Sequence, residues 1–407
     1  MPYHPNSILS SSPDVWEYAR LVYHFFILDA QSSMLFQTNP LFSYSELSLG
    51  LPESRVLWLA PSAEEWKRIH LAEYGSPDHE SEQQQQQQQQ STAPSLIECL
   101  SSFPAPVIKG QQRYQAIDVD LATHVTLHGV WHLIREFRQR NGGHHYQQLL
   151  QLPSDQMALL RQGLQQSLLE FRLLLCPLPP SSSPSPRLGQ EQGRPDSRLV
   201  LQLLSMSLYA SVDSLQTFAG KEGEEEGRHV VPALRQWFES RESRQAVWHA
   251  GQVLREARSF PRNRLRDFYA VAVYHAALAL WAYGVLAQSK LPQPPPLPPP
   301  PSPPSPAAAP SVRATTPVMV LLDSGEEDEA SVPTATEQFI DRGYGTPGIQ
   351  GGVPLHDTMG VMAAIIDILR KNNAADPSSR NGGEEVLLPP LVGNLVQLMG
   401  DLGDAGA

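Results

Sequence analysis

The sequence predicts an all-α protein in which many helices are separated by disordered low-complexity inserts. Apolar residues recur at helical spacing over most of the 407 residues, and only 318–322 (VMVLL) has the pattern of a strand. Proline accounts for 38 of the 407 residues and gathers in a few segments that cannot join a core. A single five-residue strand does not form a sheet alone, so helices must build the core.

Each predicted helix has an apolar stripe or a start signal. Glu64 and Glu65 place negative charge in the first turn of a helix over 62–72, and Ser154 is a candidate N-cap. Pro261 suits the first turn of a helix and separates two of them. The predicted helices are 15–30, 62–72, 119–140, 154–176, 198–218, 230–240, 241–260, 261–287, 355–371 and 386–402, with a helical TEQFID segment at 336–341.

Three low-complexity segments divide the chain. A Gln-rich linker covers 76–95, a Pro/Ser linker covers 177–197, and a Pro-rich linker covers 290–318. The helical regions between them are 1–75, 96–176, 198–289 and a C-terminal region over 319–405. The Pro-rich run contains PxxP spacings that SH3- or WW-type grooves bind, but its composition favours a spacer.

Charge and cysteine content exclude several classes of protein. Thirty Lys and Arg against 42 Asp and Glu give a net charge of −12, which argues against a broad phosphate-binding surface. Cys99 and Cys176 alone cannot form a disulfide framework or a Cys-rich zinc site. Residues 268–287 lack charge and are long enough to cross a bilayer. Their many alanines, with Tyr274 and His275 at the centre, favour a buried helix, and we expect no membrane partner.

No catalytic signature is present, and the sequence predicts no enzyme. The chain lacks GxSxG, HExxH and the phosphate-binding GxxxxGK. Gly343 to Gly348 formally matches GxGxxG, but a helical segment precedes it and Pro347 interrupts it, which favours a turn-rich loop. His124, His128 and His132 lie on one helix face at metal-ligand spacing. No carboxylate completes a site, so surface or core-edge histidines are the preferred interpretation.

Two groups of residues are candidate sites. Ser324 lies in the acidic run DSGEEDE at 323–329, for which a solvated loop is the preferred interpretation. The alternatives are that Ser324 is a phosphorylation site or that the loop engages a basic partner. A candidate basic patch lies between two predicted helices, and such arginines either bind nucleic acid or pair with nearby acids such as Glu256 and Asp267. Its members are Arg258, Arg262, Arg264 and Arg266.

Several segments occur in an order that resembles a known family. The N-terminal segment 19–66 carries Arg20, Leu21, Tyr23, Asp29, Ser45 to Leu47, Leu51, Pro52 and Trp58 at the expected places. It resembles the regulatory (middle homology) domain of fungal zinc-finger transcription factors. Segments 318–329, 336–349, 361–372 and 387–403 resemble the C-terminal part of the branch with two-cysteine two-histidine fingers, and the middle segments 243–258 and 266–281 are also similar.

The resemblance implies a helical, nuclear regulatory domain that controls RNA polymerase II transcription through a zinc finger on the same polypeptide. No finger is encoded here, so we expect no cofactor in this chain, zinc only in a missing N-terminal finger, and DNA contact only through that finger. Transcription machinery or co-regulators are the expected protein partners, and the oligomeric state is not predicted. The alternative is a finger-less helical interaction scaffold. Because the chain looks like a C-terminal portion, we expect an uncovered apolar face and marginal solubility.

Overall fold

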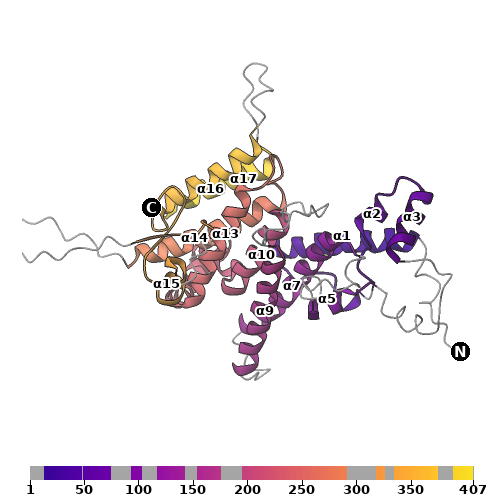
Figure 1. Ribbon diagram of the computed structural model, residues 1–407. Coiled ribbons are helices and arrows are strands. Elements are labelled where there is room, and N and C mark those ends of the chain that lie inside the picture. The colour runs from indigo at the N-terminus through magenta and orange to yellow at the C-terminus, as the bar shows by residue number, and fades with distance from the viewer. Residues whose placement is uncertain are drawn as a thin grey trace, which may run out of the picture. The chain divides into compact units, whose positions relative to one another are not determined.

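The computed structural model (Figure 1) describes residues 13–47, 49–74, 93–102, 117–142, 154–175, 195–290, 318–325, 334–374 and 388–406. This part of the chain holds fourteen α-helices, one 3-10 helix and one three-stranded sheet, which confirms the predicted all-α class. The chain divides into two compact units, residues 1–208 and 209–407. Nearly all residues of the three predicted linkers lie outside the described residues. Cys176 and the side chain of Ser154 also lie outside them.

In the first unit, helix α7 has more packing partners than any other element described there. Helices α1, α5 and α9 pack against α7, while α2 packs against α3. The faces in contact are apolar, with Phe26 and Ile134 fully buried. The elements are α1 (Pro13–Phe36), η2 (Tyr44–Glu46), α2 (Arg55–Trp58), α3 (Ala63–Tyr74), α5 (Leu96–Ser102), α7 (Val119–Gly142), α9 (Ser154–Leu175) and α10 (Pro195–Tyr209). The predicted helices over 15–30, 62–72, 119–140 and 154–176 are confirmed to within a few residues, and the short α2 and α5 were not predicted.

The second unit is built around α14 (Phe268–Gln288), against which four helices pack most extensively. They are α11 (Val212–Phe218), α13 (Arg241–Arg258), α16 (Thr358–Asn373) and α17 (Pro390–Ala405), and α16 and α17 also lie side by side (Figure 1). Two more helices, α12 (Glu224–Glu239) and α15 (Ala335–Arg342), pack on α13.

Helix α14 is long and apolar enough to cross a membrane by length and composition, but most of it is buried inside the protein. All its residues from His275 to Gly284 are buried. Trp281 donates a hydrogen bond from Nε1 to the carbonyl of Leu402, 2.8 Å away. The predicted buried helix is therefore confirmed at this place.

The prediction that a helix begins at Pro261 is wrong, because α14 begins at Phe268. Asn263 (φ 58°) and Asp267 (φ 50°) have left-handed backbone conformations, through which a helix cannot continue. The turn is held from α16 instead. Asn372 accepts the N–H of Leu265 at 2.9 Å and donates to the carbonyls of Phe260 and Pro261 at 3.1 and 3.0 Å.

Two other predicted helix boundaries are wrong. The single helix predicted over 198–218 is divided into α10 and α11, because Ser211 is extended and its hydroxyl accepts the N–H of Ser214 as an N-cap. Helix α12 begins at Glu224 rather than at Val230, with three glutamates in its first turn, where the helix dipole stabilises negative charge.

The strand predicted at 318–322 pairs with residues of the segment 343–348, for which a turn-rich loop was expected. The loop prediction is therefore wrong where this segment forms a strand. Strand β1 (Met319–Leu321) pairs in parallel with β2 (Thr346–Ile349), and β2 pairs antiparallel with β3 (Val353–Pro354). Gly345 (φ 96°) allows this pairing, since a Cβ there would lie 2.6 Å from a methyl of Val320. The GxGxxG match thus follows a helix and enters a strand, the reverse of a dinucleotide-binding arrangement.

We predict that Asn372→Ala destabilises the second unit by on the order of 3 kcal/mol, because it removes the side-chain partner of the buried N–H of Leu265 and of the carbonyl of Phe260, together with one of the two donors to the carbonyl of Pro261. Urea unfolding measures the change. The matched control is Asp367→Ala on the same helix, which removes only an exposed ion pair with Lys371 and should cost less than about 1 kcal/mol. Equal effects of the two variants would contradict the role of Asn372.

A second prediction concerns solubility. Helix α1 exposes a stripe of large apolar side chains, Tyr18, Leu21, Phe25, Leu28 and Phe36. Leu21→Gln with Phe25→Gln should reduce self-association and leave the unfolding temperature unchanged, because both side chains are about half exposed. Light scattering against concentration measures this, with Glu64→Gln and Lys67→Gln on the exposed face of α3 as the control. Aggregation that is the same in both variants would contradict the prediction.

Candidate functional site

Arg20, the first residue of the family-like pattern, holds three parts of the first unit together. Its guanidinium forms a 2.5 Å ion pair with Asp118, and both side chains are largely buried, at 14% and 7% exposed. It also donates to the carbonyl of Glu53 and lies over the ring of Trp58, 5.1 Å from its centroid. Asp118 in turn accepts the N–H of Leu121 at the start of α7. Arg20 thereby connects α1, the segment containing α2, and the N-terminus of α7.

Tyr23 and Asp29 fix the segment that follows α1. The hydroxyl of Tyr23 donates to the carbonyl of Leu49 at 2.5 Å, and burial raises the pKa of this hydroxyl. The carboxylate of Asp29 accepts the N–H groups of Leu41 and Phe42 at 2.8 and 2.9 Å. Tyr23 and Asp29 therefore each give main-chain groups of the following segment a hydrogen-bond partner.

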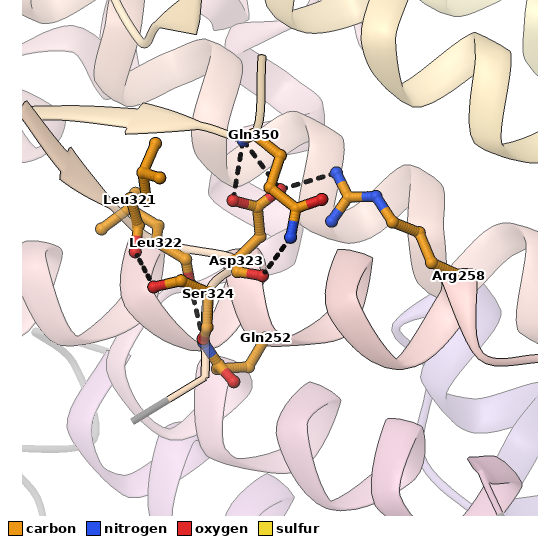
Figure 2. A network of polar contacts seen from close by, with 7 residues as sticks. All are labelled: Gln252, Arg258, Leu321, Leu322, Asp323, Ser324 and Gln350. Atoms are coloured by element: carbon orange, nitrogen blue, oxygen red, sulfur yellow. Dashed lines mark hydrogen bonds and ion pairs between the residues drawn. The ribbon is translucent and has the colours of Figure 1, made fainter. Parts of the chain in front are cut away.

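The second unit contains a buried carboxylate, Asp323, two residues after the end of β1. Its side chain is 0% exposed and forms a 2.6 Å ion pair with Arg258 of α13, whose side chain is 28% exposed. The N–H of Gln350, directly after β2, donates to the same carboxylate at 2.8 and 3.1 Å. Figure 2 shows Arg258 and Gln350 converging on Asp323. Since a buried charge needs such partners, Asp323 fixes both strands to α13.

Gln252 of α13 holds the main chain on either side of Asp323. Its side-chain NH₂ group donates to the carbonyls of Leu322 and Ser324 at 2.7 and 3.0 Å (Figure 2). Its side-chain oxygen accepts a hydrogen bond from Arg255. Gly251 permits this close contact, because a Cβ there would lie 2.4 Å from the carbonyl oxygen of Leu322. The polar contacts thus require the helix backbone to lie against the strand.

Ser324 is partly exposed, and its hydroxyl donates to the carbonyl of Leu321 at 2.9 Å. The interpretation of the acidic run as a solvated loop is wrong at Asp323, which is fully buried. Residues 326–329 of the run lie outside the described residues. Phosphorylation of Ser324 stays a prediction. Its carbonyl accepts from Gln252, and Arg255 lies beside the following residue, Gly325.

The four arginines of the candidate basic patch have different surroundings. Arg258 belongs to the Asp323 network and so pairs within the fold. Arg262, Arg264 and Arg266 are exposed on the turn between α13 and α14, where Arg266 lies 3.8 Å from the carboxylate of Asp267. Binding of nucleic acid by these arginines stays a prediction.

The interpretation of the three histidines of α7 as surface or core-edge residues is wrong for two of them. His128 is fully buried, and its Nδ1 lies 2.7 Å from the carbonyl of His124. His132 is 6% exposed and stacks on Phe26 with 5.0 Å between ring centroids. Burial lowers the pKa of His132 to about 4, against the opposite effect of Asp29. Among the residues that the structure describes, no group of His, Cys, Asp or Glu could hold a metal ion.

Sequence patterns alone missed the acidic partners of these sites. Asp118 and Asp323 lie 98 and 65 residues from the arginines that they bind. A local signal existed for Asp118, since it directly precedes a predicted helix, where aspartate is a preferred cap. For Asp323, the only signal was its place after a short apolar strand.

Residues 4–154 match a family model described as the fungal specific transcription factor domain. The match covers less than half of the chain and includes all the pattern residues from Arg20 to Trp58, together with Asp118. It supports a fungal-specific transcription factor domain in this region, which suggests a regulatory domain and a family that is not enzymatic. No curated protein and no solved structure matches the chain significantly.

The buried histidines predict acid sensitivity. His132 in the first unit and His275 in the second both have a pKa of about 4, because burial disfavours the charged imidazolium and, at His275, Lys221 adds repulsion. In the unfolded chain a histidine has a pKa near 6.5. Between these values only the unfolded state binds the proton, so stability is full above about pH 6.5 and falls as pH decreases toward 4.

We therefore expect His132→Phe, which keeps a ring on Phe26, to reduce the loss of stability between pH 7 and pH 4 by on the order of 2 kcal/mol. Urea unfolding at a series of pH values measures this. Leu21→Gln, at an exposed position of α1 that carries no titratable group, is the control and should leave the pH dependence unchanged. An identical pH profile for His132→Phe and the parent chain would contradict the prediction.

Proposed function

We propose that this chain is the regulatory part of a fungal-type transcription factor and acts in the nucleus on RNA polymerase II transcription. The observation that carries the proposal is the family match over 4–154. The contacts of Arg20, Tyr23 and Asp29 support it, because the residues that give the resemblance are those that hold this region in its folded form.

In this proposal, DNA contact comes from a zinc-finger module on the same polypeptide, and zinc is bound there. The net charge of −12 supports this division of roles, since a chain of this charge repels nucleic acid. The helical units then modulate the output of the finger through contacts with transcription machinery or co-regulators.

A finger-less interaction scaffold is the second candidate function. The exposed apolar stripe of α1, with Tyr18, Leu21, Phe25 and Leu28, favours it, because exposed apolar surface of this kind is typical of protein contacts. The two functions differ in whether the chain changes transcription when it is brought to a promoter.

The test fuses the chain to an unrelated DNA-binding domain and measures a reporter with matching sites in a fungal cell. We expect a several-fold change in output, either up or down, that is lost with Arg20→Ala, because this variant leaves Asp118 buried without its cation. The matched control is Arg68→Ala, which removes an exposed ion pair with Glu65 and should keep the effect.

Immunoblots must show that the variants accumulate to similar levels. Reporter output equal to that of the DNA-binding domain alone would contradict the regulatory function and leave the scaffold as the better account. Loss of the effect in both arginine variants would contradict the role given to the Arg20–Asp118 pair.

A further inference from the structure

The turn after β1, residues 322–325, is attached to α13 by polar contacts that a nearby negative charge would change. We call this segment the β1 turn. Its attachments are the ion pair between Asp323 and Arg258 and the two hydrogen bonds from Gln252 (Figure 2). Within the turn itself, Ser324 donates its hydroxyl hydrogen to the carbonyl of Leu321. The serine therefore lies among groups whose pairing depends on charge.

We propose that Ser324 is a phosphorylation site and that its phosphate releases the β1 turn from α13. Ser324 is partly exposed and Gly325 beside it is exposed, so a kinase has access to this end of the turn. In the sequence, Glu326, Glu327 and Asp328 follow. Carboxylates after the acceptor serine fit a kinase with a basic peptide groove, by the general rule of charge complementarity. This proposal goes beyond the transcriptional function and does not rest on it.

The chemical step is ordinary phosphoryl transfer from ATP. A bond forms between Oγ of Ser324 and the γ-phosphorus as the bond from that phosphorus to the bridging oxygen breaks. The hydroxyl proton passes to a base on the kinase, and ADP leaves. The serine thereby loses its only hydrogen-bond donor on the side chain and gains a group with a charge of about −1.5 to −2 at neutral pH.

The product does not fit the arrangement in Figure 2. A phosphoester oxygen cannot donate to the carbonyl of Leu321, so two acceptors would face each other at a distance of 2.9 Å. The phosphate also adds negative charge next to Asp323, whose carboxylate is fully buried and pairs with Arg258. The side chain of Arg258 is partly exposed, so it can turn toward the new anion and leave Asp323 without its cation.

Arg255 adds to the same effect. Its Nη2 would lie 3.5 Å from a Cβ at Gly325, which places this guanidinium beside the phosphate. It now donates to the side-chain oxygen of Gln252, the residue that holds the turn, at 3.3 Å. When Arg255 pairs with the phosphate, Gln252 loses this orienting contact. Arg258 and Arg255 thus exchange their present partners, Asp323 and Gln252, for the phosphate, and the β1 turn loses contacts that hold it to α13.

The first experiment compares the full chain with and without phosphoserine placed at position 324 during translation. Hydrogen exchange should be faster at the N–H of Leu322, which bonds Gly348, and at the N–H of Gln350, which bonds Asp323. The unfolding temperature should fall by a few degrees. The unmodified Arg258→Gln variant should show the same changes, and phosphoserine should add little to them.

The matched control is Arg266→Gln, because Arg266 is exposed and its nearest recorded acid is Asp267. In that variant phosphoserine should retain its full effect. Unchanged exchange at Leu322 and Gln350, or a higher unfolding temperature on phosphorylation, would overturn the proposal. An equal loss of the phosphoserine effect in the Arg258 and Arg266 variants would overturn the role of Arg258.

The second experiment treats the folded chain with an acidophilic serine kinase and ATP. Mass spectrometry should place phosphate on Ser324, and Ser324→Ala should remove that signal. Glu327→Gln with Asp328→Asn should lower the rate of incorporation several-fold. Failure to phosphorylate Ser324, or a rate that does not depend on these carboxylates, would sink the assignment of the site. Neither experiment reads transcription, so each can fail while the proposed function stands.

Discussion

Helix α14 is apolar on all sides, and the second unit depends on enclosing it. Five helices pack around it, α11, α12, α13, α16 and α17, and the enclosure is close enough that a Cβ at Gly284 would lie 2.1 Å from the carbonyl oxygen of Leu355. Enclosing one helix so completely also buries main-chain groups of the turns that connect its neighbours, such as those at Leu265 and Leu322. Buried N–H and C=O groups need partners, so this packing creates a demand for polar side chains inside the fold.

Both units meet that demand in the same way, with single side chains that bond the main chain of distant segments. Asn372 holds the α13–α14 turn, Gln252 holds the β1 turn, and Arg20 and Tyr23 hold the segment after α1. A neutral amide such as Asn372 offers no simple means of release. The ion pair of Asp323 does, because its strength depends on other charges close to it, and this difference makes the β1 turn the place where a new charge can loosen the fold.

Most helices could be predicted from the sequence, but the structure of the turns could not. Apolar periodicity located α7, α13 and α16 to within a few residues, because buried apolar residues recur at helical spacing along each of them. It failed at Pro261, since the local preference of proline for a first turn was overruled by contacts with Asn372, 111 residues away. The glycines at 343–348 indicated turns correctly, but not the strand pairing that Gly345 allows. Asp118 and Asp323 could not be predicted as partners of the arginines for the same reason, since ion pairs across 98 or 65 residues leave no local pattern.

The family match over residues 4–154 includes residues that stabilise the fold of this region, and this limits what the match says about function. Arg20, Tyr23 and Asp29 are directed at main-chain groups of their own unit. A family pattern made of such residues is kept by any member that folds in this way, whatever its partner or promoter. It follows that the family match argues for a regulatory domain as a class, while what distinguishes this chain must come from residues outside the pattern. Ser324 and Asp323 lie in the other unit, outside the matched range of residues 4–154, so the match says nothing about their role.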